Sequence, residues 1–281
     1  MSPTLKNILR RFVPRQLRNY LRHPGKALHW WINDLRIPID LEIRPGWRLK
    51  CPRNALDVAF GLQLHDPPQM RELDEFISLV KSQPKVLLLD IGCHFGVFSF
   101  AAAHYGPESV RAVAVDASPP ACKMVERIAG LNHVANKVGV IHAAVAASGG
   151  ELEMISSGVG SAYYMVPPTD QPAFERTRIP TTTVDRLVED IDEVPTVIKI
   201  DVESYEWEVL QGARKTLEQH SLPLCLELHC LQLRRRGLDP TSVIQLLAGF
   251  GYTDFSSDGR SISTDEILKA EIIRLIVRNP S

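Results

Sequence analysis

The residues best suited to chemistry follow directly after two apolar runs. The first run, residues 86–89, leads into the turn Asp90-Ile91-Gly92-Cys93-His94-Phe95-Gly96, and the second, residues 110–115, ends at Asp116. The glycines let the backbone turn tightly near a ligand, and the helix that follows offers free N–H groups. An acid twenty positions after the last glycine is suited to bind both hydroxyls of a ribose. The pattern predicts an adenosine-type cofactor site formed by Asp90, Gly92, Cys93, His94, Gly96, Asp116 and Ala117.

The same turn discriminates between cofactors. A dinucleotide fold uses Gly-x-Gly-x-x-Gly, whose second glycine makes room for a pyrophosphate, whereas Cys93 and His94 crowd that place here. A carboxylate at Asp90 suits a ligand with a cationic amino-acid end. The sequence therefore favours S-adenosylmethionine and methyl transfer. Two alternatives stay open: an NAD(P)-dependent oxidoreductase, and a cofactor-binding module without catalytic activity.

A second group of candidate residues follows the apolar run at 196–200. Asp201 and Glu203 lie at the end of this predicted strand, and His229 ends the next one, at 222–228. Methyl transfer to a hydroxyl needs in-line positioning and a base that accepts the proton. We predict Asp201 as that base, or as the partner of the donor's ammonium group, with Glu203 as the second choice and His229 as the third.

These residues also have plainer interpretations. In the structural alternative, Lys199 and Glu206 form surface ion pairs, Asp201 caps the following helix, and the histidine is a hydrogen-bonded structural residue. Asp201, Glu203 and His229 together offer the ligands that a divalent ion binds, but nothing in their spacing demands a metal. We therefore predict no metal site.

Seven predicted strands must position these residues. Helical stretches separate most of them, which is typical of a parallel sheet covered on both faces. The final two strands are too close together for a helical crossover and are expected to pair antiparallel at one edge. The expected fold is α/β, with a doubly wound, mostly parallel, Rossmann-like sheet. The strands are expected at residues 86–89, 110–115, 138–145, 196–200, 222–228, 252–255 and 272–277.

The chain before this sheet has a different character. We predict a basic amphipathic arm at residues 1–36, a hairpin and a helix at 37–84, and the cofactor-binding domain at 85–281. Residues 1–50 carry eleven Lys and Arg against three acids. The arm is interpreted as a helix packed on the catalytic domain or on a second subunit, or alternatively as a peripheral membrane contact or a transit peptide.

Composition limits the class of protein. A chain of 281 residues with 44% hydrophobic residues can bury a large core, and a net charge of −1 gives no global reason to expect a nucleic-acid partner. Five cysteines without Cys-x-x-Cys spacing argue against a disulfide framework or a thiolate zinc site and favour the cytoplasm. No apolar run reaches the ~20 residues that span a bilayer, and no secretory signal is evident.

Three further segments have local interpretations. The sequence Asp66-Pro67-Pro68-Gln69 is interpreted as a turn, and Arg234-Arg235-Arg236 as a solvated loop. The polar insertion at 148–180 is expected to contribute to the pocket for a small-molecule or glycan acceptor.

Taken in order, the motifs DIGCHFG, the acid Asp116, KIDVESYEWEVLQGA and LELH resemble the FkbM family of S-adenosylmethionine-dependent methyltransferases. The resemblance covers about residues 86–230. Its most specific part is the fourth-strand motif, which this chain matches at Lys199, Asp201, Glu203 and Glu206. The resemblance implies a class I methyltransferase fold and O-methylation of a hydroxyl on a sugar, glycan or secondary metabolite.

The chain departs from the family pattern at two places. The family usually has Ala-Asn where Cys93-His94 stand, so any contact made by that asparagine must come from His94 or be absent. It usually has glycine where Ser204 stands, which affects how closely a substrate approaches the backbone there.

Overall fold

The structure is a computed structural model that describes residues 38–52, 55, 65–156, 163–165 and 175–280. The chain divides into two compact units, Met1–Val58 and Ala59–Ser281. In the first unit, β1 (Ile39–Arg44) and β2 (Trp47–Cys51) form an antiparallel hairpin, as the sequence predicts. The predicted basic arm lies outside the described residues.

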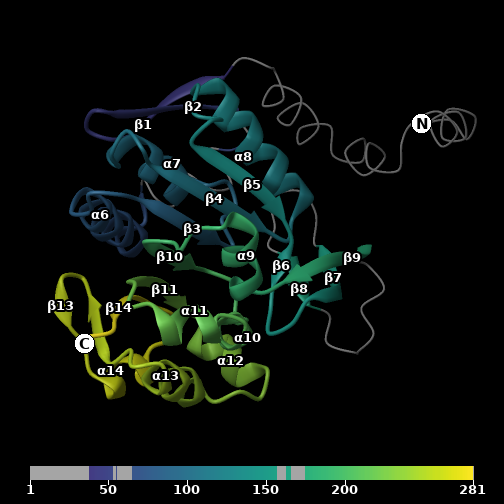
Figure 1. The fold of residues 1–281 in the computed structure, drawn as a ribbon, viewed down its shortest axis with the longest axis vertical. Helices are drawn as coiled ribbons and strands as arrows, with labels where there is room; N and C mark the ends of the chain where they lie inside the picture. The colour runs from purple at the N-terminus through teal and green to yellow at the C-terminus, as the bar shows by residue number, and fades with distance from the viewer. Residues whose placement is uncertain (1–37, 53–54, 56–64, 157–162, 166–174, 281) are drawn as a thin grey trace, which may run out of the picture. The chain divides into compact units, whose positions relative to one another are not determined.

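An eight-stranded sheet runs through the second unit in the order β13-β12-β14-β11-β10-β3-β4-β5 (Figure 1). The strands from β11 to β5 are parallel, and β14 is antiparallel to both of its neighbours. The expected mostly parallel sheet is confirmed, and the two-residue strand β13 adds an eighth strand to the predicted seven. The strands are β3 (Leu87–Ile91), β4 (Arg111–Asp116), β5 (Val138–His142), β10 (Val197–Ile200), β11 (Leu224–Leu228), β12 (Asp254–Ser257), β13 (Arg260–Ser261) and β14 (Ile273–Arg278).

Strand order reverses between β3 and β10. From β3 the chain moves outward through β4 to β5, then returns to β10 on the other side of β3. Ligands of doubly wound sheets bind beyond the carboxyl ends of the strands at such a reversal. The motifs singled out from the sequence lie at the carboxyl ends of these strands.

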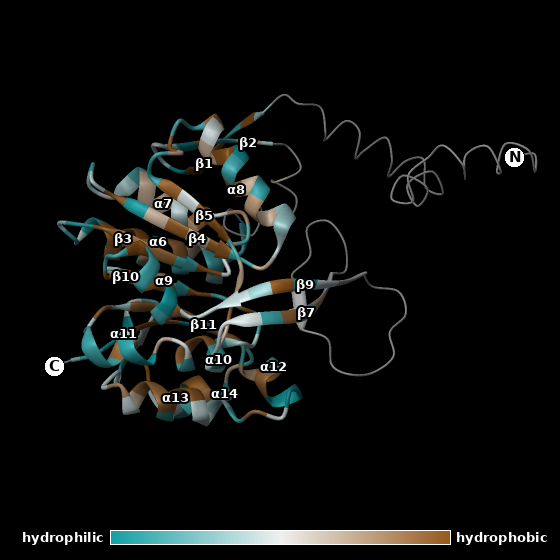
Figure 2. Ribbon diagram, turned by 45° about the vertical axis from the view of Figure 1, so that its right-hand side comes forward, coloured by the Kyte–Doolittle hydropathy of each residue, from teal (hydrophilic) through white to brown (hydrophobic). Residues whose placement is uncertain are grey.

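Helices cover both faces of this sheet. Helices α6 (Pro67–Lys81) and α7 (Val97–Tyr105) pack together through an edge-to-face contact of Phe76 with Phe98. The opposite face is apolar: Leu89 and Ile198 share a core with α9 (Val184–Ile191) and with helices that follow it. The strands are accordingly mostly brown in Figure 2. The other helices are α8 (Pro119–Leu131), α9 (Val184–Ile191), α10 (Glu206–Gln211), α11 (Arg214–Gln219), α12 (Cys230–Arg235), α13 (Pro240–Gly249) and α14 (Thr264–Lys269).

Helix starts follow from local capping chemistry. Ser118 accepts a hydrogen bond from the Ala121 amide ahead of Pro119, and Asp239 caps α13 in the same manner. The interpretation of residues 66–69 as a simple turn was wrong. Asp66 is the N-cap of α6, and the two prolines occupy the first turn of that helix.

A second sheet lies in the predicted polar insertion. The strand expected at 138–145 ends at His142, and the next residues begin a four-stranded sheet with the order β6-β9-β7-β8. The exposure of Glu151, Leu152, Glu153 and Met154 alternates, which is typical of a half-buried strand. Four residues are too few to make this alternation a strong signal in the sequence. These strands are β6 (Ala144–Val145), β7 (Gly150–Ser156), β8 (Tyr163–Met165) and β9 (Glu175–Thr182).

Two helical segments have local causes. The segment after β10 is broken between α10 and α11, where a Cβ on Gly212 would collide with the carbonyl oxygen of Ala146. The polar loop before β14 contains α14, which begins with a capping box formed by Ser263 and Glu266.

The arginine run at 234–236 is also more ordered than predicted. Arg236 follows α12, and its guanidinium lies 3.7 Å from the centre of the Tyr205 ring. It donates hydrogen bonds to the Ser204 carbonyl and to Glu208. The prediction of a solvated loop was therefore wrong: Arg234 and Arg235 lie in the last turn of α12, and these contacts hold Arg236.

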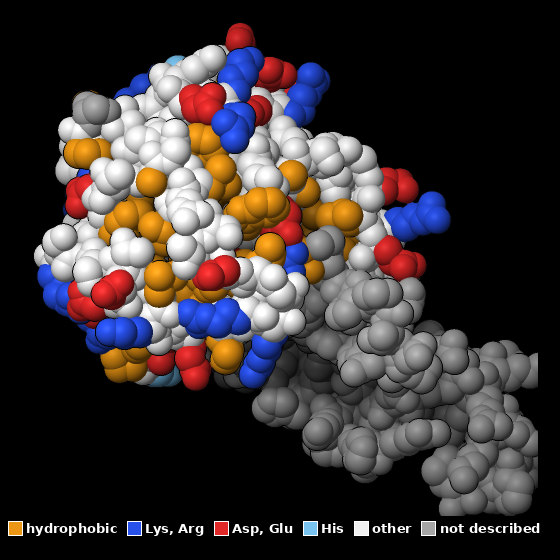
Figure 3. All heavy atoms as spheres, turned by 90° about the horizontal axis from the view of Figure 1, so that it is seen from below, with side chains coloured by type: hydrophobic (Ala, Val, Ile, Leu, Met, Phe, Trp, Pro, Cys, Tyr) orange, Lys and Arg blue, Asp and Glu red, His pale blue; other side chains and the backbone are white. Residues whose placement is uncertain are grey.

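The surface mixes charges of both signs. On the face shown in Figure 3, Lys and Arg side chains are interspersed with Asp and Glu between apolar patches. Within the described part of the chain, no helix is both long enough and apolar enough to cross a membrane.

Candidate active site

The turn after β3 lies across the ends of its neighbouring strands. The amides of Gly92 and Cys93 both donate to the Val115 carbonyl of β4, at 2.8 and 3.1 Å, and Asp201 at the end of β10 donates to Ile91. Gly92 has φ +75, and a Cβ there would collide with the Asp201 carbonyl oxygen. Glycine at 92 is therefore required by the close approach of two backbones.

The rest of this turn leads into α7. Cys93 is buried, and its thiol faces the His94 carbonyl at 3.8 Å, so it forms part of the core. Gly96 is the left-handed N-cap residue of α7, and its amide donates to the Cys93 carbonyl at 2.7 Å. Burial raises the pKa of the Cys93 thiol well above its ordinary value, which keeps it neutral.

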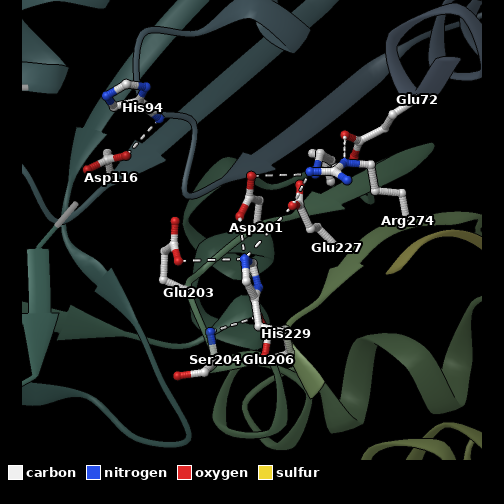
Figure 4. A network of polar contacts seen from close by, with 11 residues as sticks. Glu72, His94, Asp116, Asp201, Glu203, Ser204, Glu206, Glu227, His229 and Arg274 are labelled. Carbon is white, nitrogen blue, oxygen red and sulfur yellow. Dashed lines mark hydrogen bonds and ion pairs between the residues drawn. The ribbon is translucent and has the colours of Figure 1, made fainter. Parts of the chain in front are cut away.

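A hydrogen bond joins His94 in this turn to Asp116 at the end of β4. The His94 amide donates to Asp116 Oδ2 at 2.8 Å (Figure 4). The Ser118 amide donates to Oδ1 at 2.7 Å. His94 has φ +49, a region in which asparagine and histidine are both enriched. This shared preference explains how histidine stands where the FkbM pattern usually has asparagine. Ala117 follows, and its carbonyl lies 3.1 Å from Nε2 of His142.

The structure turns Asp90 inward. Its Oδ2 accepts hydrogen bonds from the amide and hydroxyl of Ser99 in α7, at 3.1 and 2.6 Å, and the residue is 1% exposed. Alternation along β3 puts residue 90 on the face covered by α6 and α7. Its predicted contact with the cofactor stays a prediction, and it would have to be made by Oδ1.

Asp201, Glu203 and His229 come together beyond the ends of β10 and β11 (Figure 4). Nε2 of His229 lies 4.0 Å from Asp201 Oδ1, 3.6 Å from Glu203 Oε2 and 3.9 Å from Glu227 Oε1. The imidazole is 3% exposed, whereas the Asp201 and Glu203 side chains are 33% and 42% exposed. The two carboxylates thus form the accessible side of the cluster, and the histidine lies beneath them.

Glu206 holds the histidine from the other side. Its Oε1 lies 2.7 Å from Nδ1 of His229 and accepts a hydrogen bond from the Ser204 amide at 2.9 Å. Glu206 is fully buried and Ser204 is 4% exposed. Ser204 has φ +82 and Glu203 has φ +52, a left-handed pair that turns the chain sharply after β10.

Lys199 connects the cluster to α6. Its Nζ lies 2.8 Å from Glu72 Oε1 and 4.0 Å from Asp201 Oδ2. Arg274 of β14 bonds both Glu72 and Glu227, at 3.0 and 2.5 Å. Lys199 is 1% exposed. The alternative of surface ion pairs for Lys199 and Glu206 was therefore wrong. Asp201 does not cap the following helix, because α10 begins at Glu206 and its N-cap residue is Tyr205, which makes no side-chain cap.

Burial and charge move the pKa values of these groups apart. Burial raises the pKa of Asp116 to about 6, against the two backbone hydrogen bonds that it accepts. Burial and the nearby Asp201 raise the pKa of Glu227 to about 8. Burial alone lowers the pKa of His229, but Glu206, Asp201 and Glu203 outweigh it and raise that pKa to about 9. Burial also raises the pKa of Glu203, although His229 opposes this effect.

Sequence reasoning missed part of this cluster. Glu72 belongs to a helix far earlier in the chain, and no local pattern marks it. Arg274 is a charged residue inside the apolar run of β14, which is a usable signal of a buried partner. Glu227 shares a strand face with His229, two residues further on, and this alternation is a usable signal that the two side chains lie together.

Comparison with known proteins identifies the family. The model of the methyltransferase FkbM domain matches residues 90–253, more than half of the chain. No curated protein matches the chain.

Among solved structures, the chain is similar to an FkbM methyltransferase from Methylobacillus flagellatus (14% identity, TM-score 0.46, covering 80% of this chain and 54% of that one). It is also similar to an O-methyltransferase from Bacillus cereus in complex with SAH (14%, 0.48, 90% and 96%). A third similar structure is a precorrin-6y C5,15-methyltransferase from Geobacter metallireducens (13%, 0.45, 74% and 87%).

The family match decides between the cofactors that the glycine turn left open. It supports the methyl donor rather than a nicotinamide dinucleotide. The chain therefore belongs to the FkbM family of S-adenosylmethionine-dependent methyltransferases.

Proposed function

We propose that this enzyme methylates a hydroxyl group on a sugar, glycan or secondary metabolite. One observation carries the proposal: two accessible carboxylates, Asp201 and Glu203, lie over a buried imidazole at the carboxyl edge of the sheet, where doubly wound folds bind their ligands. A hydroxyl is a weak nucleophile while it keeps its proton, so its methylation needs a proton acceptor at the site. A cluster of carboxylates beyond β10 supplies one.

The residues at the switch point suit S-adenosylmethionine. An ionised carboxylate has about four lone-pair sites, and the two backbone amides at Asp116 use one on each oxygen. The remaining sites are available to the two hydroxyls of a ribose. The Asp201 carboxylate would then lie toward the cationic part of the cofactor, where opposite charge favours binding.

The cofactor supplies an electrophilic methyl group and leaves as a neutral thioether. In the proposed step, the acceptor oxygen forms the new C–O bond as the S–C bond breaks, and the electron pair of that bond stays on sulfur. Glu203 takes the hydroxyl proton, because it is the most accessible acid of the cluster. His229 lies 3.6 Å from Glu203 and stabilises its charged form.

The proposal is tested by supplying acceptors in matched pairs. Each pair contains a hydroxylated sugar or phenol and its amino analogue, and formation of S-adenosylhomocysteine and of the methylated product is measured. We expect transfer to the hydroxyl member. Glu203→Gln should lower kcat/KM by about 10²- to 10⁴-fold, the usual contribution of a positioned base. Transfer to amines alone, or an undiminished rate in this variant, would contradict the proposal.

A matched variant controls for indirect effects. Glu189 is an exposed glutamate on α9 that pairs with Lys215 and Arg186 and with no residue of the cluster in the described structure. Glu189→Gln should keep the wild-type rate. Both variants should bind S-adenosylmethionine with nearly unchanged affinity by calorimetry, which shows that they fold.

A further inference from the structure

We propose that Asp201, Glu227 and His229 form a binding site for a divalent metal ion beside the acceptor. The inference deepens the proposed function, and its catalytic part rests on that function. Among the described residues, these three side chains each offer a ligand atom, and the atoms all lie within 4.8 Å of one another. They come from the carboxyl ends of β10 and β11, two adjacent parallel strands.

The distances suit a single ion. Two donors bound to one ion at about 2.1 Å each are separated by at most about 4.2 Å. Nε2 of His229 lies 4.0 Å from Asp201 Oδ1 and 3.9 Å from Glu227 Oε1, so both pairs already meet that limit. The widest pair needs to close by about 0.6 Å or less, which a small rotation of the half-exposed Asp201 provides.

An independent observation concerns the histidine rather than the acids. The imidazole is 97% buried, and its Nε2 points into the group of carboxylates without a hydrogen bond in the described structure, since the nearest oxygen is 3.6 Å away. Its Nδ1, by contrast, is fixed by Glu206 at 2.7 Å. A carboxylate on one ring nitrogen, with the other directed at oxygen donors, is the arrangement that orients metal-binding histidines.

The charges around the site leave room for a cation. Lys199 is directed mainly at Glu72 and reaches only Oδ2 of Asp201, at 4.0 Å, so Oδ1 stays turned toward the histidine. Arg274 compensates Glu72 and Glu227. Five carboxylates (Glu72, Asp201, Glu203, Glu206 and Glu227) face three cationic groups, Lys199, Arg274 and the protonated imidazole of His229. A divalent ion would displace the proton on Nε2 of His229 and add positive charge to this acid-rich cluster.

One imidazole and two carboxylates suit an ion such as Mn²⁺, which accepts mixed nitrogen and oxygen ligands and keeps open positions for water or substrate. In the proposed role the ion binds the acceptor oxygen and stabilises the alkoxide that forms as the proton passes to Glu203. The methyl group is then transferred as described above, and the ion does not change its oxidation state.

The test uses Mn²⁺ alone with the full-length protein, first treated with a chelator. The electron paramagnetic resonance signal of free Mn²⁺ reports binding, and electron spin echo modulation of the bound ion reports a directly coordinated imidazole nitrogen. We expect binding with nitrogen modulation in the wild type. His229→Gln should weaken binding by at least about a hundredfold, and Glu227→Gln by about tenfold or more. The spin-echo signal needs no variant, so a poorly folded His229→Gln leaves the test intact.

Glu203→Gln is the matched control, because this acid is close to the cluster but is not one of the proposed ligands. It should bind Mn²⁺ within about threefold of the wild type while losing methyl transfer. Absence of nitrogen modulation, or wild-type binding in His229→Gln, would overturn the metal site.

The two proposals fail separately. Full hydroxyl methylation after complete metal removal would overturn the metal site and leave the proposed function standing. Mn²⁺ bound through His229 in an enzyme that methylates only amines would do the reverse.

Discussion

Glu206 lies 2.7 Å from Nδ1 of His229, and both residues are almost completely buried. The same carboxylate oxygen accepts the amide of Ser204 at 2.9 Å. One glutamate therefore fixes both the imidazole at the end of β11 and the sharp turn after β10. Through Glu206, the histidine at the end of β11 is linked to the turn after β10. This link helps to fix the position of Glu203, which lies in that turn.

Replacing Glu206 with glutamine should weaken both bonds without changing the shape of the side chain. The variant Glu206→Gln keeps an acceptor for the two donors but loses its charge, so we expect unfolding free energy to fall by about 1 to 3 kcal/mol. Urea unfolding measures this change. Glu218→Gln, which breaks an exposed pair with Arg214, should leave stability nearly unchanged. Equal effects in the two variants would show that the buried bonds contribute nothing.

Lys199 of β10 forms a buried ion pair with Glu72 of α6 and so links these two elements. Lys199→Met removes the charge that faces Glu72 and Asp201 inside the protein, and breaking a buried pair in this way typically costs about 3 to 5 kcal/mol. The expected loss is measured by denaturant unfolding. Lys215→Met, at an exposed pair with Glu189, is the control and should have little effect. A Lys199 variant as stable as this control would contradict a stabilising role for the pair.

The sequence predicts the sheet and the meeting of Asp201, Glu203 and His229 for one physical reason. Parallel strands end at the same edge, so residues that follow adjacent strands must be close in space. The alternation of strands and helices in the sequence was therefore enough to predict that Asp201, Glu203 and His229 lie close together.

The remainder depends on contacts that no local pattern records. Arg274 reaches Glu72 across 202 positions of sequence. The inward direction of Asp90 was available from strand alternation, but its partner Ser99 was not, because it depends on how α7 packs on β3. The second sheet was missed because β6 and β8 have only two and three residues, too few for a hydrophobic period to appear.

Ser204 tests the departure from the family's usual glycine. A residue with a side chain at φ +82 is strained by about 1 to 2 kcal/mol relative to glycine. Ser204→Gly should therefore raise the unfolding free energy by about 1 kcal/mol, since the backbone amide that donates to Glu206 is retained. Ser78→Gly in the middle of α6 should lower it by about the same amount, because glycine is a poor helix former. Destabilisation by both substitutions would show that the serine is not strained.

With Asp116 as the proposed partner of the ribose, we expect the binding of S-adenosylmethionine to depend on pH. The pKa of Asp116 in the free protein is raised to about 6, so below that pH the carboxyl is protonated and is a weaker acceptor for the ribose hydroxyls. Affinity should rise as the pH increases from 5 to 7 and then level off, with a slope of at most about tenfold per pH unit.

A second acid complicates the assignment of this dependence. Burial raises the pKa of Asp90 to about 6 as well, and the charges of Asp90 and Asp201 raise the pKa of Asp116. The wild-type profile alone therefore does not show which carboxyl group is responsible. Asp116→Asn resolves this: it should bind the cofactor about 10- to 100-fold more weakly at pH 7.5 and lose most of the pH dependence, whereas the exposed Asp190→Asn should keep both. Calorimetric titration across this range provides the measurement, and an unchanged profile in Asp116→Asn would assign the dependence to another group.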